Sequence, residues 1–395
     1  MNNHDRAREM RAKGRTYREI SEALNVPRET VRDWLTKTTN PDQHSGRVID
    51  GLRRQLRRAE DAAGMTSRVR EEIFKIAATD PQPPGWVTRV STVPHQVTPL
   101  AILSDIHYSE VTRPGAVNGV NAYNPRIAQE RLQRWADLLL TRCFDDRTHR
   151  DYPGLVVALG GDMLSGDIHE ELAETNEVST MPAMLELMEV LSSVLRKLQA
   201  EFKQVFIPCT FGNHGRNTRK VRFKRRPYSN FDWLLSCLLV KYLGREEGFQ
   251  FLVPESTDTY FHVQGRAILL NHGDTTGARG GDGFIGALGP IKRGEGKVRR
   301  ASEKMQMPFQ HFLHGHWHSQ YVLGAILSNG CVCGYNEYAK DQLRAEPEPP
   351  QQILTFLNRP WGVVDYSPLI LGDPPRGSDR RTVRSLPGLP HTQAA

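Results

Sequence analysis

Cysteine is scarce in this chain, and no paired cysteine motif is present. Only five of the 395 residues are cysteines (Cys143, Cys209, Cys237, Cys331 and Cys333), and none forms a CxxC pair. The spacing gives no indication of a zinc ribbon, and the odd, scattered set gives none of a disulfide framework. Such cysteine usage fits a reducing compartment, so we expect a cytoplasmic protein.

Long apolar runs are also missing. The N-terminal sequence MNNHDRAREMR is charged from its start and lacks the apolar core of a signal peptide. The longest apolar stretch, LLSCLLV before Lys241, is far shorter than the roughly 20 residues that a membrane-spanning helix needs. We therefore expect neither export nor a membrane partner.

Acidic residues are outnumbered by basic ones, 45 to 52, which gives a formal net charge of +7. A surplus of this sign suits a soluble protein with an anionic partner, and nucleic acid is one such partner. The length of 395 residues allows one large hydrophobic core and a smaller appended module.

Residues 4–38 are predicted to form a compact unit of three helices. Apolar residues recur there at helical spacing, and breaks fall at Gly14 and before Pro27. Proline is tolerated in the first turn of a helix, where its missing N–H costs little. A small all-α domain is therefore expected over residues 1–40.

The pattern YREISEALNVPRETVRDWL resembles the helix-turn-helix of resolvase-like and homeodomain-like DNA-binding modules. The resemblance implies that the helix from about residue 28 to residue 37 enters the major groove of DNA. Its candidate DNA-binding residues are Arg28, Thr30 and Arg32. The alternative is a small helical module for docking or oligomerisation.

Two further segments are read from composition. Residues 41–98 are expected to connect the two domains. They begin with an arginine-rich helical segment at 46–78 and end with a proline-rich linker. Residues 374–395 are rich in Pro, Gly, Ser and Arg, which is typical of a flexible basic tail.

Between residues 99 and 373, short polar blocks follow apolar runs. The blocks are Asp105-Ile-His107, Gly161-Asp162, Gly212-Asn213-His214, Asn271-His272-Gly273 and Gly315-His316-Trp317-His318. The preceding runs favour buried strands, and helical patterns intervene at about 126–144, 181–202 and 231–243, so the region is predicted to be α/β. Blocks at the C-terminal ends of such strands can meet at one rim, where α/β sheets commonly bind ligands.

The order, residue types and spacing of these blocks resemble the calcineurin-like metallophosphoesterase family, whose pattern runs Asp-x-His, Gly-Asp, Gly-Asn-His, His and Gly-His-x-His. The resemblance implies a β-sandwich flanked by helices over residues 99–373. It also implies two divalent metal ions, with Asp162 as the bridge. The first ion would be bound by Asp105, His107 and His318, and the second by Asn213, His272 and His316.

The same resemblance implies a mechanism. A hydroxide between the two ions would attack phosphorus, and His214 would protonate the leaving oxygen. Manganese is the expected metal by resemblance, although such ligands also accept iron, zinc or other divalent ions.

The chain departs from the family pattern in two places. Relatives often carry Asp or Glu directly after Gly-Asn-His, where this chain has Gly215. Ser165 stands where the protein-phosphatase branch has an Asp that orients the catalytic His, and the next carboxylate is Asp167. The group that orients His214 therefore remains open, and a phosphoprotein phosphatase is disfavoured. His169, His311 and His314 fall outside the motif and are interpreted as strand residues or outer residues of the site.

Acidic residues are absent from the segment RNTRKVRFKRR, residues 216–226, which holds seven basic residues. We expect its cations to bind substrate phosphates, with aromatic Phe223 interleaved as in surfaces that bind nucleic acid strands. The candidate phosphate ligands are Arg216, Arg219, Lys220 and Arg222. The alternative is a solvated loop whose charges balance the acidic stretch 167–189.

A second basic segment, residues 277–300, is rich in glycine but lacks the GxxxxGK[ST] arrangement of a nucleotide-binding P-loop. We expect it to be a mobile loop near the site.

These features together predict a dinuclear-metal-dependent phosphodiesterase that acts on DNA, close to the nuclease and DNA-repair exonuclease side of the family. Two alternatives stay open. One is a phosphatase or phosphodiesterase for small nucleotides or other phosphoesters. The other is a non-catalytic DNA-binding regulatory protein with a structural metal site. Exo or endo action, DNA or RNA preference and oligomeric state are not set by the sequence.

Overall fold

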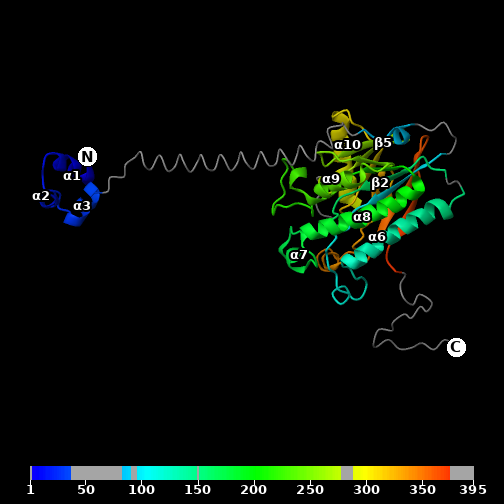
Figure 1. The fold of residues 1–395 in the computed structure, drawn as a ribbon, viewed down its shortest axis with the longest axis horizontal. Helices are drawn as coiled ribbons and strands as arrows, with labels where there is room; N and C mark the ends of the chain where they lie inside the picture. The colour runs from blue at the N-terminus through cyan, green and yellow to red at the C-terminus, as the bar shows by residue number, and fades with distance from the viewer. Residues whose placement is uncertain (1, 37–81, 90–95, 149–150, 277–287, 374–395) are drawn as a thin grey trace. The chain divides into compact units, whose positions relative to one another are not determined.

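The computed structural model describes residues 2–36, 82–89, 96–148, 151–276 and 288–373 (Figure 1). The chain divides into two compact units, Met1–Lys75 and Ile76–Ala395. The predicted arginine-rich connector at 46–78 and the predicted basic tail at 374–395 lie outside the described residues.

In the first unit, three short helices pack around a small apolar cluster. They are α1 (Asn3–Ala12), α2 (Tyr17–Leu24) and α3 (Arg28–Thr36). A capping box between Thr16 and Glu19 starts α2, and Asn25, in the left-handed conformation with φ 52°, ends it. The cluster is formed by the buried side chains Ala7, Ile20, Leu24 and Val31.

The second unit contains a six-stranded sheet in the order β11-β10-β1-β2-β3-β4. Its parallel strands are β1 (Thr98–Leu103), β2 (Leu155–Leu159), β3 (Val205–Pro208) and β4 (Phe249–Leu252). A C-terminal hairpin, β10 (Gln351–Asn358) and β11 (Gly362–Ile370), adds to β1 in antiparallel fashion.

A five-stranded sheet in the order β5-β6-β7-β9-β8 accompanies it. The central strands β6 (Arg266–Leu270), β7 (His311–His314) and β9 (Ile326–Ser328) run parallel. The edge strands β5 (Thr259–Val263) and β8 (Tyr321–Leu323) are antiparallel to their neighbours. All strand and helix assignments refer to the described residues.

Alternating side chains of β1 show how the layers are built. Leu100 and Ile102 belong to the apolar cluster shared by the two sheets, whereas Ala101 and Leu103 belong to the cluster under the helices. Successive side chains of a strand point to opposite faces, so β1 is buried on both sides. The two sheets therefore pack face to face, with helices on the outer faces.

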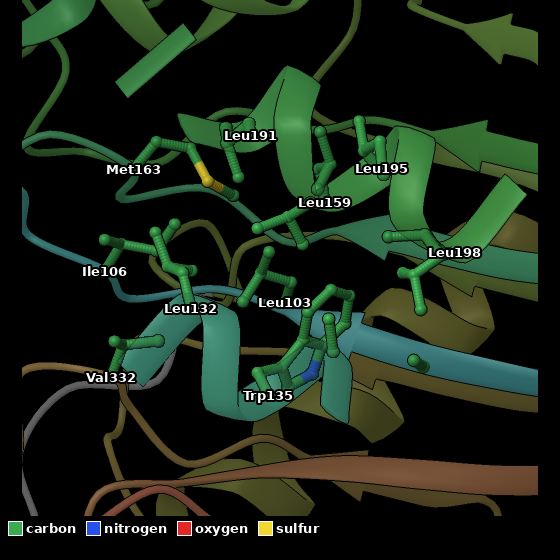
Figure 2. Close-up of a cluster of buried hydrophobic side chains, with 14 of the residues drawn as sticks. Leu103, Ile106, Leu132, Trp135, Leu159, Met163, Leu191, Leu195, Leu198 and Val332 are labelled. Atoms are coloured by element: carbon green, nitrogen blue, oxygen red, sulfur yellow. The ribbon is translucent and has the colours of Figure 1, made fainter. Parts of the chain in front are cut away.

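The helical layer on the six-stranded sheet consists of α6 (Pro125–Leu140), α8 (Thr180–Phe202) and α9 (Phe231–Leu243). Figure 1 shows α6 and α8 lying side by side. In Figure 2, Trp135 of α6 and Leu195 of α8 point toward Leu103 and Leu159 at the ends of β1 and β2. This packing fixes the strand ends that carry the first polar blocks.

The shorter described helices are α5 (Gly85–Thr88) and α7 (Glu170–Thr175), with single helical turns at Thr141–Asp145, Pro227–Ser229 and Tyr338–Gln342. No described helix is both long and apolar enough to cross a membrane.

The α/β prediction is confirmed, and each apolar run that precedes a polar block forms a strand, namely β1, β2, β3, β6 and β7. The loop predicted over 277–300 is wrong for its described part, because α10 (Leu288–Lys304) occupies it. Ile291, Glu295 and Ser302 form a buried helical stripe, and Ile291 packs on the outer face of the five-stranded sheet. Glycine content masked this periodicity.

Candidate metal centre

The predicted ligands lie just beyond strand ends of both sheets. Asp105 and His107 follow β1, Asp162 follows β2, Asn213 follows β3, His272 follows β6, and His316 and His318 follow β7. Ion-pair and hydrogen-bond distances join the two groups, since Asp162 contacts His272 and Asp105 contacts His316. The site is therefore built where the ends of the two sheets meet.

The backbone has an unusual conformation at several of the predicted ligands. The left-handed region, which non-glycine residues seldom adopt, contains Asp105 (φ 52°), His107 (φ 49°), Asp162 (φ 50°), His316 (φ 71°) and His318 (φ 55°). Each such residue costs on the order of 1–3 kcal/mol and persists only where its surroundings enforce it. Here the enforcement includes cross-strand bonds from the Asp105 N–H to the Gly161 carbonyl (3.0 Å) and from the His107 N–H to the Asp162 carbonyl (3.1 Å).

Asp162 is the most central carboxylate. Its side chain is buried, with one oxygen 2.9 Å from Nε2 of His272 and 3.9 Å from Nε2 of His107. The other oxygen accepts the backbone N–H of His214 at 2.8 Å. Burial works to raise the pKa of Asp162, but the neighbouring His272 and His214 outweigh it and hold the pKa well below its usual range.

Three overlapping groups of ligand atoms lie within 4.8 Å of one another: Asp162, His272 and His316; His107, Asp162 and His214; and His107, His318 and Cys333. The resemblance assigns the pairs His272–His316 and His107–His318 to different ions. These two pairs fall in different groups here, and Asp162 shares a group with a member of each. The bridging role of Asp162 stays a prediction.

Asp105 occupies a more enclosed position. It accepts hydrogen bonds from the Ser104 hydroxyl (2.5 Å) and from the backbone N–H of His316 (3.0 Å). One of its oxygens lies 3.4 Å from Nε2 of His318. Asp105 therefore ties β1 to the loop after β7 and points a carboxylate oxygen at the His107–His318 pair.

Cys333 is a neighbour of the site that the sequence did not reveal. Its sulfur lies 3.9 Å from Nδ1 of His318, and its carbonyl accepts a 2.8 Å hydrogen bond from Arg131. The residue belongs to no motif block, and only the fold of the loop after β9 brings it here. No signal in its local sequence could have identified it.

The polar groups present fit divalent metal ions. Oδ1 of Asn213 and Nε2 of His272 are buried and have no hydrogen-bond partner among the described residues. In His272, Nδ1 lies 2.8 Å from the Gly160 carbonyl, which assigns the proton to Nδ1 and leaves Nε2 as the ligand atom. Burial works against a charged His272, yet Asp162 and Asp105 raise its pKa to about 10. The two carboxylates therefore favour positive charge at this position.

His214 is oriented by a backbone carbonyl. Its Nδ1 lies 2.9 Å from the Ser165 oxygen, and its ring packs edge-on against His107 with centroids 4.5 Å apart. The nearby carboxylate of Asp167 instead accepts a 2.7 Å hydrogen bond from Thr180. The question left open by the sequence is thus answered by the main chain at Ser165.

Two glycines of the Gly-Asn-His-Gly segment are required by close packing. A Cβ on Gly212 would overlap the carboxylate of Asp162. A Cβ on Gly215 would lie 2.6 Å from Oδ1 of Asn230 and 2.8 Å from the carboxylate of Asp232. Asn230 and Asp232 at the start of α9 therefore leave no room at 215 for the acidic residue that relatives often carry there.

The four predicted phosphate ligands differ in placement. Arg216 is half-buried and donates a 2.9 Å hydrogen bond to the Asn213 carbonyl, which holds it beside a predicted metal ligand. Arg219 forms an exposed 2.6 Å ion pair with Glu170 of the acidic stretch 167–189. This pair fits the alternative in which the basic segment is a solvated loop. Lys220 and Arg222 are exposed. Their contact with substrate stays a prediction.

Arg226, at the end of the basic segment, is a structural residue that the sequence did not single out. It is buried, pairs with Asp274 two residues after His272, and lies over the ring of Phe211. Arg216 and Arg226 therefore anchor the two ends of the segment to loops that carry predicted metal ligands.

In the first unit, the predicted DNA-binding residues lie on α3. Arg28 and Arg32 are exposed, and Thr30 is half-buried. Val31 between them is buried in the apolar cluster, so the helix presents its basic residues away from its own core.

Comparisons with known proteins find little. No family model matches the chain, and no curated protein does. Among solved structures, the chain is similar to the sulfate thiohydrolase SoxB of Thermus thermophilus with a TM-score of 0.31 and 9% identity, covering 71% of this chain and 57% of that one. It is also similar to a Staphylococcus aureus protein described as a 5′-nucleotidase, with a TM-score of 0.31 and 12% identity, covering 71% and 55%.

The chain thus spans less than two thirds of either neighbour, 57% and 55%. Similarity at this level establishes neither family nor activity.

Gly212→Ala tests the close packing at the candidate centre. The added methyl group would displace the carboxylate of Asp162, so we expect Mn²⁺ affinity to fall by at least about 10-fold, as when an outer partner of a ligand is lost. Isothermal titration calorimetry measures this effect. Gly115→Ala is the matched control, because nothing lies within 4 Å of its added Cβ. Equal Mn²⁺ affinity in both variants would contradict the assignment.

Proposed function

We propose that this protein is a metal-dependent phosphoesterase that hydrolyses phosphodiester bonds in nucleic acid, with DNA as the substrate. The observation that carries the proposal is the buried Asp162, which is near two separate pairs of imidazoles at the meeting point of the sheets. Such mixed carboxylate, amide and imidazole sets suit divalent ions.

Seven residues would hold the ions, manganese being the expected metal: Asp105, His107 and His318 on one side, Asn213, His272 and His316 on the other, and Asp162 between them. When bound, a pair of divalent ions neutralises phosphate charge and makes hydroxide available near neutral pH. The chain's own contribution is to orient these ligands through its left-handed turns and to direct Nδ1 of His272 to the Gly160 carbonyl, so that Nε2 faces Asp162.

His214 supplies the proton for the leaving oxygen in this proposal. Because Nδ1 faces the Ser165 carbonyl, Nε2 is the atom left to deliver a proton when the ring is charged. His214 also lies in one group with Asp162 and His107, so its imidazole is next to the predicted ions. Arg216, held against Asn213, is placed to neutralise a phosphate oxygen beside them.

The basic segment 216–226 supports a nucleic acid strand as the substrate. Its ends are fixed near Asn213 and His272, while Lys220, Arg222, Phe223, Lys224 and Arg225 are exposed. Phe223 is 88% exposed, so its ring is accessible to a partner. An aromatic ring among cations suits stacking with an unpaired base whose flanking phosphates meet the cations.

His214→Ala tests the proton donor. We expect turnover of DNA to fall by about 10²–10⁴-fold, the usual contribution of general acid–base catalysis, with Mn²⁺ binding retained. Steady-state cleavage of a labelled oligonucleotide measures this loss. His262→Ala, which removes an exposed imidazole from β5, serves as the control. Retained manganese-dependent turnover in purified His214→Ala would refute the role.

Phe223→Ala tests the choice of substrate. We expect KM for single-stranded DNA to rise about 5- to 100-fold, the range for loss of one base-stacking contact, with turnover of an aryl phosphodiester unchanged. The control is Trp361→Ala, which removes another aromatic residue, 79% exposed, from the loop between β10 and β11. Preference for small nucleotides, together with no effect of Phe223→Ala, would favour the small-phosphoester alternative.

The paired substitution Arg28→Ala and Arg32→Ala tests DNA targeting by α3. Two lost phosphate contacts would lower the slope of log affinity against log salt by about 2 and weaken DNA binding, whereas aryl phosphodiester turnover would not change. Arg8→Ala on α1 is the exposed basic control. Unchanged DNA affinity would remove α3 from the proposal. Salt-sensitive DNA binding without any metal-dependent cleavage would instead favour the regulatory alternative.

A further inference from the structure

We propose that Asp232, in the first turn of α9, is a positioning residue that fixes Asp162 and Asn213 relative to each other for metal binding. The inference rests on the metal site of the proposed function and concerns a residue outside its motifs. It starts from the carboxylate's contacts with the two ligand loops.

One carboxylate joins the loops that follow β2 and β3. Oδ2 of Asp232 accepts the backbone N–H of Gly212 at 3.0 Å, and Oδ1 accepts that of Leu164 at 3.4 Å. Gly212 directly precedes Asn213, and Leu164 lies two residues after Asp162. A shift of Asp232 would therefore move both predicted ligands.

The start of α9 reinforces this connection through its capping residue. Asn230 caps the helix by accepting the Asp232 N–H at 2.8 Å, and its amide donates to the Gly212 carbonyl at 2.8 Å. Both backbone polar groups of Gly212 are thus held by one helical turn. The Phe231 N–H also donates a 2.6 Å hydrogen bond to the Gly215 carbonyl. The start of α9 is therefore hydrogen-bonded to both ends of the Gly-Asn-His-Gly segment.

The Asp232 carboxylate lies among backbone groups and close to a second carboxylate. The side chain is completely buried, and its recorded partners among the described residues are backbone N–H groups rather than cations. It also interacts unfavourably with the negative charge of Asp162. A neutral asparagine would remove that repulsion, but it has only one acceptor oxygen and would lose the bond to one of the two ligand loops.

Asp232→Asn in the full-length chain separates positioning from plain stabilisation. We expect Mn²⁺ affinity, measured by calorimetry, to fall about 10–100-fold, the usual effect of losing an outer partner of a metal ligand. With chelator present, the variant should unfold at the wild-type temperature or above it, because repulsion from Asp162 is relieved. Turnover of an aryl phosphodiester should recover at raised Mn²⁺ concentration.

The matched control is Ser236→Ala, one turn further along α9, where a hydroxyl bonds to the Asp232 carbonyl but to neither ligand loop. It should leave Mn²⁺ affinity unchanged. Unchanged affinity in Asp232→Asn would overturn the proposal, and so would a lowered unfolding temperature in chelator, which would mark a structural role. A wild-type chain that itself binds no Mn²⁺ would instead refute the proposed function on which the inference rests.

Discussion

A buried negative charge shared between two sets of imidazoles is the constraint around which the larger unit is arranged. The salt-bridge contacts of Asp162 in the described part of the chain are made with histidines and with no lysine or arginine. Burying such a charge is costly unless opposite charge compensates it. The left-handed turns at the predicted ligands let the backbone place their side chains around Asp162. The missing side chain at Gly212 leaves room for the Asp162 carboxylate.

The sheets explain how distant blocks reach this charge. Parallel strands β1, β2 and β3 end at one edge, and β6 and β7 of the second sheet bring His272, His316 and His318 to the same place. Helices α6 and α8 keep the strand ends in register by packing on one face, and the cluster between the sheets fixes the other. Backbone carbonyls then orient two of the imidazole rings. The Gly160 carbonyl faces Nδ1 of His272, and the Ser165 carbonyl faces Nδ1 of His214.

Much of this arrangement could be predicted from the sequence, for a physical reason. Each apolar run ends in predicted ligands, and strand burial together with strand direction is enough to bring them together. The orientation of His214 by the Ser165 carbonyl could not be predicted, because a backbone oxygen has no residue signature. The approach of Cys333 and Asp232 depends on tertiary packing, and α10 was missed because its glycines hid a buried helical stripe. Substrate choice rests on the exposed part of segment 216–226, whose residue types alone fit both a phosphate clamp and a solvated loop.

The central claim is that Asp162 lies between two metal ions. Anomalous X-ray scattering at the manganese edge, from crystals of the full-length protein grown with Mn²⁺, tests it most directly. The account predicts two peaks about 3.5–4 Å apart, the usual spacing in two-metal hydrolytic sites. One should lie beside His107 and His318, the other beside His272 and His316, with Asp162 in contact with both. A single peak, or ions bound away from Asp162, would contradict the account.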